Sequence, residues 1–243
     1  MAKRIFWTND RFSLASVEIT QRCNNHCHYC DQTRADRDMP VAQFVALLDE
    51  LVAEDVESVA LGGGEPTLHP ALPVLLDAVR KRGLRAGLTT NARDPGQVMA
   101  LADSDLLYSF GISAGKGEWT VLAAHPRAVI NLLLLREGLK KVIEWAVQAI
   151  LHGAICLLLL GYKGARYEFA PTTDELSAAF SLLTRMGQRA RVTVAADGYT
   201  RRRLGLAETC GEEFVRINLD GTRDNCCFPS CEYRNLNVGT GLD

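Results

Sequence analysis

Short apolar segments alternate with amphipathic segments along most of this chain, and this alternation restricts its fold more than any other feature. Apolar segments of strand length lie at residues 16–20, 58–61, 84–90, 106–113, 128–135, 154–160 and 191–196. Amphipathic segments between them predict helices at residues 41–55, 73–82, 95–102, 138–152 and 173–186. Continuous apolar strands separated by helices are typical of a parallel sheet covered by helices. Six or seven such units predict an α/β fold, a complete or partial (β/α) barrel.

The pattern changes after Thr209, where two short strand-like segments flank the turn dipeptide Asp220-Gly221. Such a dipeptide between two strands predicts a β-hairpin, here with cysteines at its borders. The hairpin strands are expected at residues 213–219 and 222–225. We therefore expect a barrel over residues 1–200, a linker within residues 197–206 and a small C-terminal β-hairpin metal-binding module over residues 201–243.

The charge and hydropathy of the chain argue against two classes of partner. In 243 residues, 27 Lys and Arg nearly balance 29 Asp and Glu, and a net charge of −2 gives no general attraction to nucleic acid or anionic lipid. No apolar run approaches the roughly 18 residues that a membrane helix needs, and the first ten residues lack a signal-peptide core. We expect a soluble cytoplasmic protein that binds neither membranes nor nucleic acid.

Eight cysteines are unusual for such a protein, because a reducing cytoplasm does not favour disulfides and cysteines there more often bind metal or do chemistry. Seven of them form two groups: Cys23, Cys27 and Cys30 near the start, and Cys210, Cys226, Cys227 and Cys231 near the end. The remaining one, Cys156, lies inside an apolar strand and is expected to be a small buried residue. The two groups indicate two metal sites.

The first group, Cys23, Cys27 and Cys30, places three thiolates in a short loop directly after a predicted strand. A compact loop of this kind can bind three irons of a cubane iron–sulfur cluster and leave the fourth iron open for a ligand. A zinc site that adds His26 or His28 to the three cysteines is the alternative, although zinc sites more often show C-x2-C pairs.

This C-x3-C-x2-C spacing, with an aromatic residue before the last cysteine, resembles the cluster motif of radical S-adenosylmethionine (radical SAM) enzymes. Residues 63–66 (GGEP) agree with it, since they follow the second strand, where that family has its GGEP turn. The resemblance implies a [4Fe–4S] cluster whose open iron binds S-adenosylmethionine (SAM). It also implies reductive cleavage of SAM to a 5'-deoxyadenosyl radical, which abstracts a substrate hydrogen. The three loop cysteines then act as cluster ligands and catalytic residues.

The resemblance also implies contacts to SAM. The residues concerned are Tyr29 near the adenine, Gly63, Gly64 and Glu65 near the ammonium group, Ser113 near the ribose and Asn131 on the fifth strand. Glycines let the backbone approach a ligand, and peptide and carboxylate oxygens accept hydrogen bonds from an ammonium. For Asn131, an ordinary polar strand residue is an equal alternative. Thr90 and Asn91 end the third strand at the same mouth and are expected to cap the next turn, with a contact at that mouth as the alternative. Lys163 and Arg166, just beyond the sixth strand, are expected to be solvated, with substrate contact as the alternative.

The C-terminal cysteines resemble a second signature of the same superfamily. Cys210, Gly221 and Cys226 fit the C-x9-15-G-x4-C pattern of Twitch and SPASM extensions, which bind an auxiliary [4Fe–4S] cluster. Cys231 and Cys227 complete the set of possible ligands, with Cys227 as a possible bystander because two adjacent cysteines are poorly placed for one cluster. The short remaining chain favours the single-cluster Twitch version, and a structural zinc is the alternative.

The resemblance fixes the initiating chemistry but leaves the substrate open. We expect a peptide or a small metabolite to be oxidised, crosslinked or epimerised, with electrons from a donor such as flavodoxin or ferredoxin. The 15 residues before the first predicted strand are too few for a separate leader-peptide domain, which keeps the small metabolite equal to the peptide. The alternatives are an activase of a glycyl-radical enzyme and a non-catalytic zinc or iron–sulfur binding protein.

Overall fold

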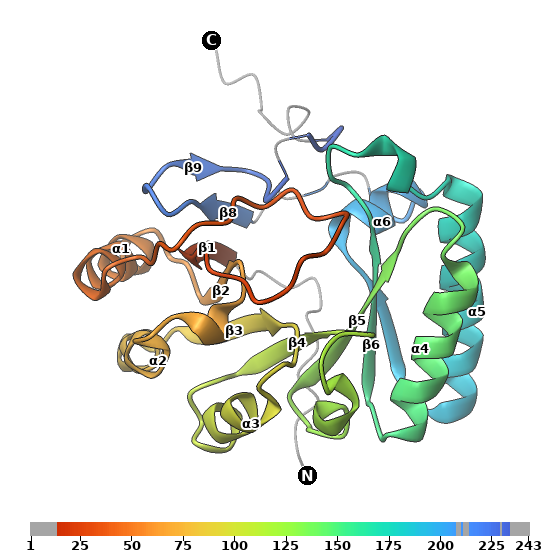
Figure 1. The fold of residues 1–243 in the computed structure, drawn as a ribbon, viewed down its shortest axis with the longest axis horizontal. Helices are drawn as coiled ribbons and strands as arrows, with labels where there is room; N and C mark the ends of the chain where they lie inside the picture. The colour runs from red at the N-terminus through yellow and green to blue at the C-terminus, as the bar shows by residue number, and fades with distance from the viewer. Residues whose placement is uncertain (1–13, 208–209, 211–213, 229, 234–243) are drawn as a thin grey trace.

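The computed structural model describes residues 14–207, 210, 214–228 and 230–233. Its strands form one sheet in the order β7-β6-β5-β4-β3-β2-β1-β8-β9 (Figure 1). Neighbouring strands from β7 to β8 run parallel, and β9 runs antiparallel to β8. The strands are β1 (Leu14–Thr20), β2 (Ser58–Gly63), β3 (Arg85–Thr90), β4 (Ser109–Ser113), β5 (Ala128–Leu134), β6 (Cys156–Gly161), β7 (Thr193–Ala196), β8 (Phe214–Ile217) and β9 (Arg223–Asp224).

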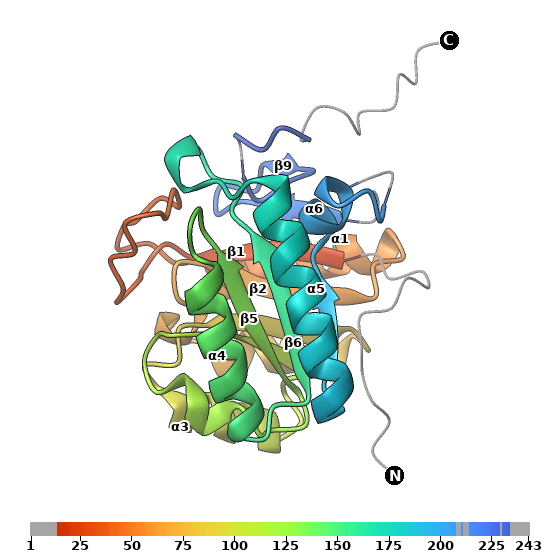
Figure 2. The ribbon, with the colours of Figure 1, turned by 90° about the vertical axis from the view of Figure 1, so that its right-hand side faces the viewer.

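Helices cover the outer face of the curved sheet, so that the described strands form a partial barrel (Figure 1). The helices are α1 (Val41–Ala53), α2 (Leu72–Lys81), α3 (Pro95–Asp103), α4 (Leu139–Leu151), α5 (Thr173–Ala190) and α6 (Gly198–Arg203). Figure 2 shows α4 and α5 side by side over β5 and β6. None of the described helices is long and apolar enough to cross a membrane. The predicted α/β fold class is confirmed.

The first strand shows how the sequence separates the core from the barrel interior. Side chains alternate between the two faces of a strand, and Ala15, Val17 and Ile19 of β1 are completely buried in the apolar core. Ser16 and Glu18 therefore lie on the other face, which looks into the barrel. The interior beside β1 is thus polar, which suits a binding site better than a packed core.

Two local predictions are corrected by the structure. Residues 197–206 were expected to be a linker, yet α6 forms there because the Asp197 carboxylate accepts a hydrogen bond from the amide of Thr200 at 2.9 Å and caps the helix. Helix α5 extends past the predicted end at residue 186 to Ala190, where Arg191 adopts a left-handed conformation (φ 58°) and ends it.

The C-terminal hairpin is attached directly to the barrel sheet. Strand β8 pairs in parallel with β1, with Ser16 opposite Arg216, and β9 then turns back along β8. This antiparallel hairpin agrees with the sequence-based expectation, although its predicted first residue, Glu213, lies outside the described residues. Residues 1–13 and 234–243 also lie outside the described residues. The predicted division between a barrel over residues 1–200 and a module over residues 201–243 stays a prediction.

Candidate functional site

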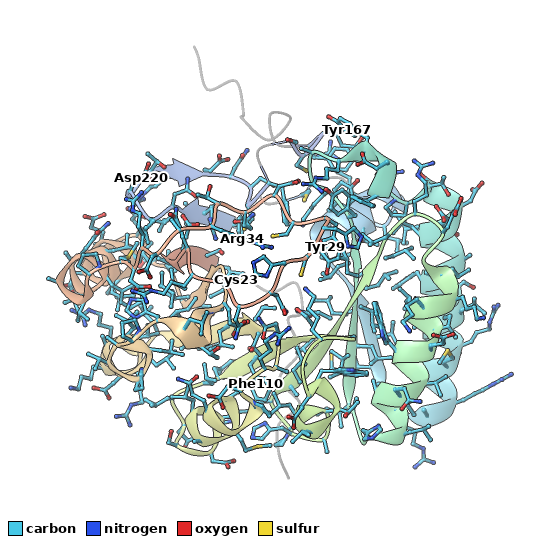
Figure 3. All side chains as sticks on the ribbon, in the orientation of Figure 1. Cys23, Tyr29, Arg34, Phe110, Tyr167 and Asp220 are labelled. Atoms are coloured by element: carbon cyan, nitrogen blue, oxygen red, sulfur yellow. The ribbon has the colours of Figure 1, made fainter. Side chains whose placement is uncertain are left out.

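The first cysteine group lies in the segment between β1 and α1, residues 21–39, here named the cluster loop. Cys23, Cys27 and Cys30 are half-buried and line a cavity of about 310 Å³. Figure 3 shows Cys23, Tyr29 and Arg34 along this loop. The cavity is also lined by residues from five other segments: Gly62, Gly63, Gly64, Glu65, Pro66, Thr89, Thr90, Asn91, Ser113, Lys116, Arg216, Cys227 and Phe228. The cysteine loop and the GGEP turn, 33 residues apart at Cys30 and Gly63, therefore share one cavity.

The two ends of the cluster loop are fastened to each other. The amide of Gln21 donates to the carbonyl of Arg37 at 2.9 Å, and Thr20 Oγ1 donates to Asp38 Oδ1 at 2.6 Å. A β-bridge joins Thr20 and Asp38. Closing the loop at its base reduces the conformations open to the three cysteines before any cluster binds.

The middle of the loop is held from two sides. Asn91 Nδ2, just after β3, donates to Asn24 Oδ1 at 2.8 Å. On the other side, Asp31 Oδ2 accepts the amide of Ala165 at 2.6 Å and the hydroxyl of Tyr162 at 3.3 Å, both just after β6. The spacing of the cysteines gave no sign of these contacts, because the partners lie 67 to 134 residues away in the sequence.

The glycines of the GGEP turn allow the turn to touch the cluster loop. The amide of Gly64 donates to the carbonyl of Thr20 at 2.9 Å, and the amide of Glu65 donates to the carbonyl of Arg22 at 2.8 Å. A Cβ atom on Gly64 would lie 2.0 Å from the Arg22 carbonyl oxygen, and one on Gly63, whose φ is +116°, would lie 2.0 Å from that of Thr20. The motif therefore fixes the loop as well as lining the cavity.

Glu65 is buried, with 2% of its surface exposed, and both its carboxylate oxygens are engaged within the protein. Oε1 accepts the hydroxyls of Thr67 and Thr90, each at 2.8 Å, and Oε2 accepts the amide of Asn91 at 2.7 Å. Thr90 and Asn91 cap their turn as expected, since Thr90 Oγ1 accepts the amide of Ala92 at 3.0 Å and Asn91 Oδ1 accepts that of Arg93 at 3.1 Å. Their contacts with Glu65 also join β3 to the GGEP turn. Ligand binding by Glu65 itself stays a prediction.

Ser113 and Asn131 are brought together by the pairing of β4 and β5, where they are register partners. Ser113 lines the cavity, while Asn131 is 8% exposed and its Oδ1 atom has no hydrogen-bond partner among the described residues. A Cβ atom on Gly111 would lie 2.6 Å from Asn131 Nδ2, so this glycine makes room for the amide. An unpartnered buried amide oxygen is costly unless a ligand or water donates to it.

Tyr29, predicted near the adenine, belongs to an aromatic group with Tyr162, at 6.5 Å between ring centroids. Lys116 Nζ lies 5.3 Å from the centre of the Tyr29 ring. Burial raises the pKa of Tyr29, opposed by the Lys116 ammonium. Lys116, which sequence reasoning did not single out, also lines the cavity and lies over the ring of the predicted adenine contact.

Three of the C-terminal cysteines interact with one another. The thiols of Cys226 and Cys231 share a hydrogen bond, which lowers the pKa of Cys231 to about 7 and raises that of Cys226. The amide of Phe228 donates to Cys226 Sγ at 3.4 Å. Cys210 Sγ lies against Gly198, 3.5 Å from where a Cβ would stand, and interacts electrostatically with Cys226. Sequence reasoning named these three and Cys227 as the candidate ligands of one site.

Cys227 points elsewhere. Its Sγ lies 3.7 Å from Ser16 Oγ inside the barrel, and its carbonyl accepts Gln32 Nε2 of the cluster loop at 3.3 Å. Its side chain lines the cavity that Cys23, Cys27 and Cys30 share. The adjacent cysteines 226 and 227 are therefore divided between the C-terminal group and the cavity.

Lys163 was expected to be solvated, but it lies beside the C-terminal cysteine group. Its ammonium is 2.8 Å from Asp197 Oδ2, and the two side chains are 20% and 15% exposed. Burial opposes the charge of Lys163, but Asp197, Cys210 and Cys226 together raise its pKa. A cation is thus held next to thiols that become negatively charged when they bind metal.

Comparison with protein families decides the class of this site. The model that describes the Radical SAM superfamily matches residues 17–170, which include the cluster loop, the GGEP turn, Ser113 and Asn131. The chain belongs to the radical SAM superfamily. It is therefore a radical SAM enzyme, and membership implies a [4Fe–4S] cluster and SAM as cofactors.

Curated relatives of this radical SAM enzyme match it over different lengths. It is 23% identical over 244 residues to the PqqA peptide cyclase of Xanthomonas oryzae, covering 91% of this chain and 64% of that protein. It is 35% identical over 80 residues to the tungsten-containing aldehyde ferredoxin oxidoreductase cofactor-modifying protein of Pyrococcus furiosus, covering 31% of this chain and 22% of that protein. The enzyme thus spans less than two thirds of the length of these relatives.

Solved structures share its fold. SuiB of Streptococcus suis, bound to the precursor peptide SuiA, superposes with a TM-score of 0.72 at 18% identity, covering 96% of this chain and 62% of SuiB. The protein anSMEcpe, with bound AdoMet and the Cp18Cys peptide, gives a TM-score of 0.64 at 16% identity, covering 88% of this chain and 74% of that one. These likenesses show the fold and confirm the α/β architecture.

The residues of the radical SAM site fit the implied cofactors. Three cysteines of one loop line a cavity that reaches the GGEP turn and Ser113, and Asn131, the register partner of Ser113, has an Oδ1 atom with no partner among the described residues. In the described part of the chain, no three His, Cys, Asp or Glu side chains converge closely enough for a single metal ion. The ligand role of the three loop cysteines stays a prediction.

Proposed function

We propose that this radical SAM enzyme modifies a peptide at a carbon atom, using SAM and a [4Fe–4S] cluster held by Cys23, Cys27 and Cys30. The observation that carries the proposal is the cavity of about 310 Å³ that the three cysteines share with the GGEP turn. Once bound, the cofactors supply the reductive cleavage of SAM that starts hydrogen abstraction. A small metabolite in place of the peptide is the second candidate.

The protein's own residues would orient and enclose the reaction. The backbone of Gly63 and Gly64 can approach the cofactor closely, and Ser113 and Asn131 offer polar groups from neighbouring strands. Lys116 lines the cavity, and its ammonium lies 5.3 Å from the centre of the Tyr29 ring. Holding the reacting atoms close together and excluding water is what such a site must do, because a carbon radical reacts with whatever lies nearest.

Peptide modification is supported by the relatives that match most of the chain. The PqqA peptide cyclase is named for a peptide substrate, and SuiB and anSMEcpe bind peptides in the solved structures. The site itself agrees, because a second cavity of about 300 Å³ adjoins the first at Gln32, Arg216 and Cys227. Together they offer room for more than the cofactor alone.

An auxiliary [4Fe–4S] cluster is the second part of the proposal, with Cys210, Cys226 and Cys231 as ligands in a Twitch-like module over residues 201–243. Its support is the gathering of these three thiols beside the Lys163 ammonium. A cytoplasmic location and a flavodoxin or ferredoxin as electron donor complete the proposal.

The test is anaerobic reconstitution with iron and sulfide, followed by dithionite reduction with SAM and assay for 5'-deoxyadenosine. About eight irons per chain and formation of the nucleoside are expected for two cubane clusters. The C23A variant should lose about four irons and all cleavage, whereas C156A, which changes a cysteine buried in β6, should lose neither. About four irons in the wild type would remove the auxiliary cluster, and zinc without SAM cleavage would favour a non-catalytic binding protein. A stable glycyl radical on a large protein partner would favour the activase.

A further inference from the structure

The cysteine that leaves the C-terminal group, Cys227, lies where the two cavities meet. It lines the cavity of the cluster-loop cysteines and the second cavity of about 300 Å³. Only Gln32 and Arg216 share this position among the cavity-lining residues in the described part of the chain. Cys227 therefore borders both the cavity of the three loop cysteines and the second cavity.

Cys227 is held in this place from both the barrel and the cluster loop. Ser16 Oγ on β1 lies 3.7 Å from its Sγ, and Gln32 Nε2 donates to its carbonyl. Arg216, which lines both cavities with Cys227, is 5% exposed. Its Nη2 atom lies 3.6 Å from Glu18 Oε1 on β1, and this ion pair holds the hairpin against that strand. The thiol is thus a fixed feature of the wall rather than part of a free chain end.

A thiol at such a position has a definite chemical use. Its S–H bond is weaker than the C–H bonds of most substrates, so a carbon radical takes a hydrogen atom from it readily when the two are held in contact. We propose that Cys227 is a catalytic hydrogen-atom donor to the substrate radical and not a cluster ligand. The inference rests on the proposed radical reaction and deepens it, because it names how the substrate radical ends.

The step balances as follows. The substrate carbon forms a C–H bond with the hydrogen of Cys227 while the S–H bond breaks homolytically, leaving a thiyl radical on Sγ. One electron from the low-potential donor that reduces the cluster, and one proton from solvent, restore the thiol. The substrate then leaves with hydrogen replaced at carbon rather than with a net loss of two electrons. Among the expected outcomes, this favours epimerisation over oxidation or crosslinking.

The test needs no identified substrate, because the thiol hydrogen exchanges with water. The reconstituted protein is reduced with dithionite in thiol-free D2O buffer and given SAM alone, so that the nucleoside radical itself can take the Cys227 hydrogen. Wild type and C156A should give 5'-deoxyadenosine carrying one deuterium. C227S, which keeps a polar group beside Ser16 but has an O–H bond too strong to donate, should give at least several-fold less deuterium, as should C227A.

A second readout does not depend on activity. In the iron-loaded protein, iodoacetamide followed by peptide mass spectrometry should modify Cys227 and spare Cys210, Cys226 and Cys231, and C227A should bind as much iron as the wild type. Loss of iron in C227A, or protection of Cys227, would overturn the inference in favour of a ligand role. Cleavage of SAM with deuterium unchanged in C227S would also overturn it while leaving the proposed function intact. Absence of cleavage in every protein would refute both.

Discussion

Replacing Gly64 by alanine should loosen the cluster loop, and the size of the effect follows from two contacts. The new Cβ would lie 2.0 Å from the Arg22 carbonyl oxygen, whereas ordinary contact begins at 3.4 Å, so the turn and the loop must separate by about 1.4 Å. That separation breaks the hydrogen bonds from Gly64 to Thr20, at 2.9 Å, and from Glu65 to Arg22, at 2.8 Å. Two lost bonds cost about 1–3 kcal/mol and the overpacking about 1–3 kcal/mol more. We expect a loss of about 2–6 kcal/mol in the free energy of unfolding.

The assay compares G64A with G96A, the same change at a site with room. A Cβ on Gly96, in the first turn of α3, would come no closer than 3.7 Å to Asp94 Oδ1. Alanine there is expected to stabilise the helix by up to about 1 kcal/mol. Urea unfolding of the metal-free proteins measures the free energies, and iron per chain after reconstitution measures the state of the loop. If G64A unfolds at the midpoint of the wild type and binds as much iron, the reasoning from backbone contact is wrong.

Three further outcomes are expected. E65Q places an amide NH2 group against hydrogen-bond donors that point at the carboxylate in the wild type, one of them the amide of Asn91 at 2.7 Å. The substitution should lower the free energy of unfolding by about 1–3 kcal/mol, measured in urea, and E57Q at an exposed position is the control. K163M leaves Asp197 without its cation and should lower both the free energy of unfolding, measured in urea, and the iron content per chain. Unchanged iron content would show that Lys163 does not support metal binding by the C-terminal cysteines. In the metal-free protein Cys231 ionises as pH rises through about 7, so its iodoacetamide labelling should level off above pH 8, while an ordinary thiol of pKa about 8.5 keeps gaining reactivity there.

The parts of the site that consist of consecutive residues could be predicted from the sequence. The strands and helices follow from periods of two and 3.6 residues, and the cysteine loop and the GGEP turn are short enough to be seen as motifs. The ligand spacing needs only the few residues between Cys23 and Cys30. What the pattern could not give is how the turn and the loop touch, because the carbonyls of Thr20 and Arg22 that limit Gly63 and Gly64 are not part of either motif.

Residues whose role depends on distant partners were missed or misjudged. Lys163 looked like a solvated residue because nothing near it in sequence marks the Asp197 carboxylate, 34 residues away, or the cysteines beyond. Asp31 gave no signal at all, since its partners follow β6. Thr90 and Asn91 do cap their turn as predicted, but their additional bonds to Glu65 depend on the pairing of β2 with β3 and could not be seen in the sequence.

The division of the C-terminal cysteines has the same origin, and it shows why a cysteine count cannot assign ligands. Cys226 and Cys227 are adjacent, so their side chains start in different directions from the backbone. The pairing of β8 with β1 holds the hairpin against the barrel, because it sets Arg216 opposite Ser16 and leaves β9 antiparallel to β8. Cys227 meets Ser16, 211 residues earlier, while Cys226 meets Cys231. One strand pairing thus gives two neighbouring thiols different surroundings. Cys227 lines the cavity of the three loop cysteines, and Cys226 joins the group with Cys231.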